Sequence, residues 1–135
     1  GPRADKTNGL YRIVQSALKS GIVSYEGDVD AMREYIHVDD AARASIDALS
    51  DEFKNKSVVL TGQEPMRVID MLKMLAEILG YSTDSVKFIE DKYAGHYVRT
   101  PYAYQPKLGR KYIPPMHVDL GQGLLQVINE INRES

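Results

Sequence analysis

The sequence predicts a small mixed α/β lobe of about four helices and several short strands, forming one domain over residues 1–135. The chain has 135 residues and is 43% hydrophobic, which suits a single compact domain. Apolar residues at helical spacing alternate along the chain with short β-branched runs. Only fragments of strand pattern occur and no β-α-β fingerprint is present, so we do not expect a doubly wound sheet.

The first helix is expected within residues 8–21, "NGLYRIVQSALKSG". Gly21 follows the last apolar residue, where a left-handed helix cap would lie. The helical spacing comes from Leu10, Ile13, Val14, Ala17 and Leu18.

Two strands and a second helix are expected next. Residues 22–27, "IVSYEG", are β-branched and end at glycine, and residues 33–38, "REYIHV", alternate in side-chain character. Asp39 or Asp40 can cap the following helix, because short acidic side chains accept hydrogen bonds from free helix N–H groups. The apolar residues that recur on one side of this helix are Ala42, Ile46 and Leu49.

The second half predicts a strand in residues 56–62, a long helix in 64–80, a strand in 86–90 and a last helix in 118–134. Pro65 suits a first helical position, Gly80 suits the helix end, and Asp119 is a plausible cap for the last helix. The long helix should present Val68, Leu72, Leu75 and Leu79 as one stripe, with its methionines in the core or on the helix surface.

Residues 91–116 have no sustained periodicity and are rich in tyrosine and proline, so we expect a structured loop with one short strand and one short helix. Loops of this length are uncommon unless they bind something. The tyrosines could stack on a nucleobase or cover a sugar, or they could pack the loop against a domain. They are Tyr97, Tyr102, Tyr104 and Tyr112.

Composition excludes several classes of partner. The 17 basic and 19 acidic residues leave no charge excess for nucleic acid or a membrane surface, and no apolar run approaches the length of a membrane span. Zero cysteines exclude disulfides and thiolate chemistry and fit a cytoplasmic location. The three histidines, His37, His96 and His117, are scattered, so we expect no metal site and a structural role for His37.

No catalytic motif is present. The chain has no G-x-S-x-G elbow, no Walker loop and no glycine-rich phosphate cradle. Paired aspartates before a helix are caps far more often than acid and base. The residues therefore favour ligand binding over catalysis.

Three segments carry a resemblance to a known family. In order and spacing, "GPRADKTNGL", "REYIHVDDAARA" and "SVVLTGQEPMRVIDMLKMLAEILG" resemble the C-terminal substrate-binding part of extended short-chain dehydrogenase/reductases (SDRs), the NAD-dependent nucleotide-sugar epimerase/dehydratase family that includes UDP-glucose 4-epimerase. The second segment is the most specific. The resemblance covers almost the whole chain and implies isomerase-type chemistry on a nucleoside-diphosphate sugar, as in polysaccharide biosynthesis.

The resemblance assigns site residues position by position. Arg33 would contact the sugar-nucleotide diphosphate, and a planar guanidinium suits that task because it meets two oxygens at once. The alternative is that Arg33 is an ordinary solvated charge. Asn8 would also contact the diphosphate, with Leu10 near the base and Tyr25 lining the base pocket. The family's second phosphate-binding arginine has no direct match here, so Lys92 or Arg99 would supply that charge.

The resemblance also shows what the chain lacks. The family binds NAD or NADP through a glycine-rich turn and transfers protons with a Tyr-x-x-x-Lys pair, and neither lies in this sequence. We therefore expect residues 1–135 to be a fragment of a longer enzyme, without its N-terminal cofactor domain, binding no NAD or NADP and inactive alone. The alternative is a non-catalytic binding or regulatory domain derived from the family. The sequence upstream of Gly1 would distinguish the two.

Overall fold

The structure, a computed structural model, describes residues 3–62, 65–89 and 110–135. Four α-helices lie in these ranges: α1 (Gly9–Ser20), α2 (Val38–Asp47), α3 (Val68–Ile78) and α4 (Leu120–Glu134). Two short 3-10 turns, Asp51–Phe53 and Thr83–Ser85, join them to the strands. The predicted α/β lobe of four helices and short strands is confirmed.

The helix ends follow from capping chemistry. The side chain of Asn8 accepts a hydrogen bond from the N–H of Tyr11 at the start of α1. Gly21 ends α1 with a φ of +72°, a left-handed conformation that suits glycine, and Asp119 caps α4 by accepting from two backbone N–H groups. These three caps account for where the two helices start or stop.

The described strands pair only in twos. β1 (Ser24–Glu26) runs parallel to β5 (Lys87–Ile89), β2 (Met32–Arg33) runs antiparallel to β4 (Met66–Arg67), and β3 (Val58–Leu60) runs parallel to β6 (Arg110–Tyr112). No larger sheet forms within the described ranges. This arrangement agrees with the expectation that the lobe is not a doubly wound sheet.

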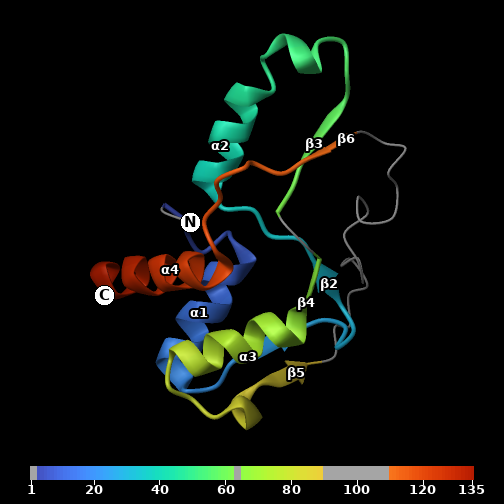
Figure 1. Ribbon diagram of the computed structural model, residues 1–135. Coiled ribbons are helices and arrows are strands. Elements are labelled where there is room, and N and C mark those ends of the chain that lie inside the picture. Colours follow the sequence, from blue (N-terminus) through green and yellow to red (C-terminus); the bar gives the residue numbers. More distant parts are fainter. Residues whose placement is uncertain (1–2, 63–64, 90–109) are drawn as a thin grey trace.

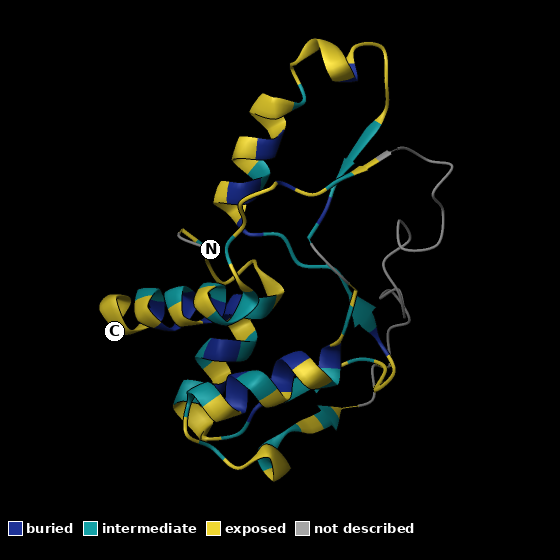
Figure 2. Cartoon of the chain, viewed as in Figure 1, coloured by how far each residue is buried: buried dark blue, intermediate teal, exposed yellow. Residues whose placement is uncertain are grey.

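The core lies between α1, α3 and α4. Helix α4 packs against both α1 and α3, and the buried faces of the three helices form one apolar cluster (Figure 2). Burial of these side chains is the main favourable contribution to folding. The cluster comprises Tyr11, Val14, Ala17, Val23, Ala31, Val68, Met71, Leu72, Leu75, Ala76, Leu124, Val127, Ile128 and Ile131.

Helix α2 stands apart from this core. Together with β3 and β6 it forms an arm that extends away from the three packed helices (Figure 1). Only Asp40 and Ala44 are buried in α2. The apolar side expected from the sequence lies in solvent, with Ile46 68% exposed and Leu49, just beyond the helix, 84% exposed.

Three boundary predictions were wrong. The strand expected over residues 33–38 is only Met32–Arg33, because its partner β4 is two residues long and α3 begins directly after it. Pro65 is therefore not the first helical residue, and α3 begins at Val68. The cap of α2 is His37, whose ring accepts a hydrogen bond from the N–H of Asp39, and not Asp39 or Asp40.

Candidate functional site

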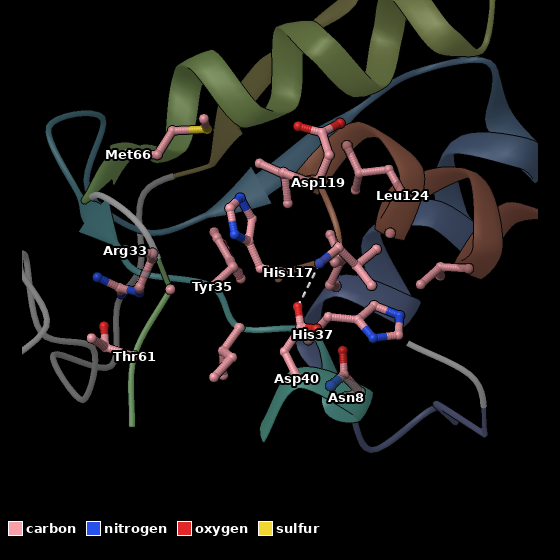
Figure 3. A pocket seen from close by; sticks show the side chains of 18 of the residues that line it. Asn8, Arg33, Tyr35, His37, Asp40, Thr61, Met66, His117, Asp119 and Leu124 are labelled. Carbon is pink, nitrogen blue, oxygen red and sulfur yellow. Dashed lines mark hydrogen bonds between the residues drawn. The ribbon is translucent and has the colours of Figure 1, made fainter. Parts of the chain in front are cut away.

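One pocket of about 520 Å³ lies where α1, α4, the β2 region and the segment before α4 meet (Figure 3). A volume of this size is typical of small-molecule sites. Its lining includes the side chains of Asn8, Leu10, Ile13, Tyr25, Arg33, Tyr35, His37, Asp40, Thr61, Met66, His117, Leu124 and Val127, together with Gly62 and Gly123.

The structure brings four of the six predicted site residues into the lining of this single pocket. Asn8 and Leu10 come from the start of α1, Tyr25 from β1 and Arg33 from β2. Lys92 and Arg99, the candidates for a second charge, lie outside the described residues, as do Tyr97, Tyr102 and Tyr104. The convergence of four positions from separate segments is a geometric finding, and their binding role remains a prediction.

The guanidinium of Arg33 is held at the pocket wall by contacts that include Met32 and Tyr25. Nη1 donates a hydrogen bond to the carbonyl oxygen of Met32 at 2.8 Å, and Nη2 lies 3.5 Å from the hydroxyl of Tyr25. The Tyr25 ring is itself set by an edge-to-face contact with Phe88 on the neighbouring strand. The cation is thus oriented by its own strand, β2, and by Tyr25 of β1.

Tyr35 adds a hydroxyl that stays protonated. Burial, the largest cause, and the phenol of Tyr25 together raise its pKa to about 12, and the charge of Arg33 partly opposes the shift. A tyrosine with this pKa remains a neutral hydrogen-bond donor throughout the physiological range. The Arg33 end of the pocket therefore offers donors to an anion, with the Tyr35 hydroxyl uncharged.

Part of the pocket lining is an apolar wall. Leu10 and Ile13 on α1 and Leu124 and Val127 on α4 contribute to this wall, whereas Met66 on β4 pairs with Arg33 on β2. Leu124 and Val127 belong to the buried core, so this wall is rigid. A ligand that fits the whole space would combine an anionic group with a flat or apolar ring.

Sequence reasoning missed a buried polar cluster beside Arg33. The carboxylate of Glu34, only 5% exposed, accepts a hydrogen bond from Lys111 at 2.7 Å and another from the hydroxyl of Thr61. Burial alone would raise the pKa of Glu34, but these two hydrogen bonds outweigh it and lower the pKa. The cluster ties the residue after β2 to β6 and to the end of β3, and no local motif reveals it.

A second missed cluster joins α2 to the segment before α4. Asp40 is buried, accepts a hydrogen bond from the N–H of Val118 at 2.7 Å and pairs with Arg43 at 2.5 Å. Desolvation opposes ionisation, yet the hydrogen bonds and the charge of Arg43 lower the pKa of Asp40. Because Val118 follows His117, this contact also fixes the pocket wall that carries His117.

His37 is hydrogen-bonded within the fold and also lines the pocket, so its structural role remains a prediction. Its Nε2 lies 2.6 Å from the side-chain oxygen of Gln126, and its Nδ1 accepts from the N–H of Asp39. These two contacts hold the imidazole ring in place. Among the described residues, no group of three or more His, Cys, Asp or Glu side chains could hold a metal ion.

Comparisons with known proteins give the fold its context. No family model matches the chain, and no curated protein matches it by sequence. Solved structures do match. UDP-glucuronic acid 4-epimerase from Bacillus cereus, in complex with UDP-glucuronic acid and NAD, aligns over all of this chain and 43% of its own, with TM-score 0.75 and 22% identity.

Two further enzymes align over the whole of this chain. RMD from Pseudomonas aeruginosa, complexed with NADPH, gives TM-score 0.68 at 18% identity and is covered over 45% of its length. dTDP-glucose 4,6-dehydratase from Bacillus anthracis, in complex with NAD, gives 0.70 at 16% identity and is covered over 42%. The chain therefore has the fold of a part of extended SDR epimerases and dehydratases, as the sequence resemblance predicted, and spans less than half of those chains.

Proposed function

We propose that residues 1–135 are the substrate-binding domain of an NAD(P)-dependent nucleotide-sugar epimerase or dehydratase. The observation that carries this proposal is the convergence of Asn8, Leu10, Tyr25 and Arg33 on one pocket. These four positions were assigned to substrate from the sequence, and they come from three separate elements. The similar folds of a UDP-glucuronic acid epimerase and a dTDP-glucose dehydratase support the same substrate class.

The diphosphate is assigned to the Arg33 end of the pocket. A guanidinium donates two parallel hydrogen bonds to phosphate oxygens, and these are among the stronger hydrogen bonds in proteins. The hydroxyl of Tyr35 adds a neutral donor there, and the side-chain amide of Asn8 is a further donor in the pocket lining, since the oxygen of Asn8 is already used as the helix cap. The apolar wall formed by α1 and α4 would then face a ring of the ligand.

The chemistry would be supplied by a second domain. When bound, NAD or NADP would accept and return a hydride, which oxidises the sugar transiently. The sequence lacks the glycine-rich turn and the Tyr-x-x-x-Lys pair needed to hold that cofactor and transfer the proton. Alone, the chain would orient the sugar nucleotide without turning it over, in the cytoplasm.

The exposed side of α2 is where we place the contact with that second domain. Val38 and Ile46 are at least half exposed, and Leu49 more so. The neighbouring β3–β6 pair is a two-stranded parallel sheet, and parallel sheets occur almost only with both faces covered. A partner packed on α2 and these strands would bury both features.

In the described residues, no helix is long and apolar enough to span a membrane.

The proposal is tested by NMR titration of the ¹⁵N-labelled chain. UDP-glucuronic acid, dTDP-glucose and NAD are added separately to millimolar concentration. We expect the sugar nucleotides to bind weakly, because one wall of their site would belong to the other domain, and to shift the amides of α1, β1 and β2 around the pocket. We expect NAD to cause no saturable shifts. Shifts that avoid the pocket, or tight stoichiometric NAD binding, would refute the proposed function.

A further inference from the structure

Gly123 lies in the first turns of α4, is half-buried and lines the pocket. Its N–H donates to the carbonyl of Asp119 at 2.9 Å, the regular helical hydrogen bond between residues four apart. It therefore occupies a helical position with ordinary hydrogen bonding.

The helix has no evident need for glycine here. The φ of Gly123 is outside the left-handed region, unlike that of Gly21 or Gly80, so an L side chain fits its backbone. Glycine within a helix is less favourable than alanine, because it loses more conformational freedom on folding. Local structure is therefore better served by alanine at this position.

Packing does not require glycine either. A Cβ on Gly123 would meet one described atom within 4 Å, the Cδ2 of His37 at 3.7 Å, which is ordinary van der Waals contact. The His37 ring is fixed by Gln126 and the N–H of Asp39, so it is already in place to receive such a contact. Apart from its chain neighbours and its own helix backbone, no other atom of the described residues lies within 4 Å of that Cβ position, and Gly123 lines the pocket.

We propose that Gly123 is a specificity-determining residue whose missing side chain leaves room for one ring of the bound nucleotide sugar, either the base or the sugar. This inference rests on the proposed function. The apolar wall of the same pocket includes Ile13, Leu124 and Val127, which belong to or pack against the buried core, so it offers little means of yielding to an added methyl group. Extra volume at residue 123 and the ligand ring then compete for the same space.

The test measures stability and affinity in the same variants. Gly123→Ala and Gly123→Leu are compared with wild type by thermal melts and by NMR titration with UDP and with UDP-glucuronic acid. Asn129→Ala is the matched control, because Asn129 is exposed on the same helix outside the pocket lining and alanine also improves helix propensity there.

For the Gly123 variants, we expect the melting temperature and the affinity for UDP-glucuronic acid to change in opposite directions. Gly123→Ala should raise the melting temperature and weaken UDP-glucuronic acid binding about tenfold, and Gly123→Leu should weaken it further. Asn129→Ala should raise the melting temperature with affinity unchanged. If the affinity for UDP falls as much as the affinity for UDP-glucuronic acid, the ring beside Gly123 is the base. If only the affinity for UDP-glucuronic acid falls, the ring is the sugar.

Three outcomes contradict the inference in distinguishable ways. Unchanged affinity in a stabilised Gly123→Ala chain shows that the space is not used by ligand, while the proposed function stands. A lower melting temperature for Gly123→Ala shows that the fold itself needs glycine. Absence of any binding by wild type refutes the proposed function, and the inference fails with it.

Discussion

Gly62 lies directly against the backbone of Tyr35, so closely that a Cβ on Gly62 would overlap the Tyr35 carbonyl oxygen. The neighbouring residues Thr61 and Glu34 are hydrogen-bonded to each other across the same junction. The close approach of Gly62 and Tyr35 brings the end of β3 against the segment after β2, and Gly62 and Tyr35 both line the pocket. The shape of the pocket wall therefore depends on a glycine at residue 62.

Gly62→Ala should destabilise the chain by at least about 2 kcal/mol, because the obstructing atom is backbone and can move only if the junction separates. Gly9→Ala is the control, since nothing lies within 4 Å of a Cβ there and α1 would gain helix propensity. Chemical denaturation of both variants measures the difference. Equal stability of Gly62→Ala and wild type would show that the close approach is not a feature of the fold in solution.

Asn8 caps α1, and one substitution can separate this role from the ligand-binding role proposed for it. Asn8→Asp should keep the cap of α1, because aspartate caps about as well as asparagine, and should leave the melting temperature nearly unchanged. It replaces the amide donor with a negative charge and should weaken UDP binding severalfold. Asn8→Ala should cost about 1 kcal/mol of stability. Undiminished UDP affinity in Asn8→Asp would remove Asn8 from the site.

Asp40 should make stability depend on pH. Its pKa is lowered below the ordinary value of 3.8 in the folded chain, so its contribution is fully present above that value and is lost as pH falls through the lowered pKa. Asp40→Asn should therefore cost about 2 kcal/mol at pH 7, with a smaller difference from wild type at pH 3. Asp39→Asn, at an exposed neighbouring carboxylate, should change little. A pH-independent gap between wild type and Asp40→Asn would contradict the assignment.

The exposed apolar side of α2 should promote association of the isolated chain. The double substitution Ile46→Glu and Leu49→Glu should abolish that association without lowering the melting temperature, since neither side chain is buried. Light scattering over a concentration series measures the first effect and a thermal melt the second. A wild-type chain that stays monomeric at high concentration would argue that the apolar side of α2 is not a surface that a partner covers.

The sequence predicted those structural features that depend on interactions between residues close together in the chain. Gly21 and Asp119 were identified as helix ends because capping chemistry acts within a few residues. The cap of α2 was wrongly assigned to Asp39 or Asp40, because His37 has the same reach and the choice depends on Asp40 being drawn to Val118, 78 residues away.

The sequence predicted only part of the candidate site, because some of its contacts join residues far apart in the chain. Asn8, Leu10, Tyr25 and Arg33 were selected through the family resemblance, and the fold brings them to one pocket. The Glu34–Lys111 contact joins residues 77 apart, so no spacing pattern indicates it. Contacts of this kind depend on the tertiary fold, and sequence periodicity carries no information about them.

The most direct test of the proposed function is the dissociation constant of UDP-glucuronic acid for Arg33→Ala relative to wild type, with Arg33→Lys measured alongside. If Arg33 binds the diphosphate, its loss removes a charge-assisted contact of roughly 1.5 to 3 kcal/mol, and the dissociation constant should rise about ten- to one-hundredfold. Lysine should recover only part of this, because it lacks the planar fork. An unchanged dissociation constant in a folded Arg33→Ala chain would contradict the proposal that this pocket binds a nucleoside-diphosphate sugar through Arg33.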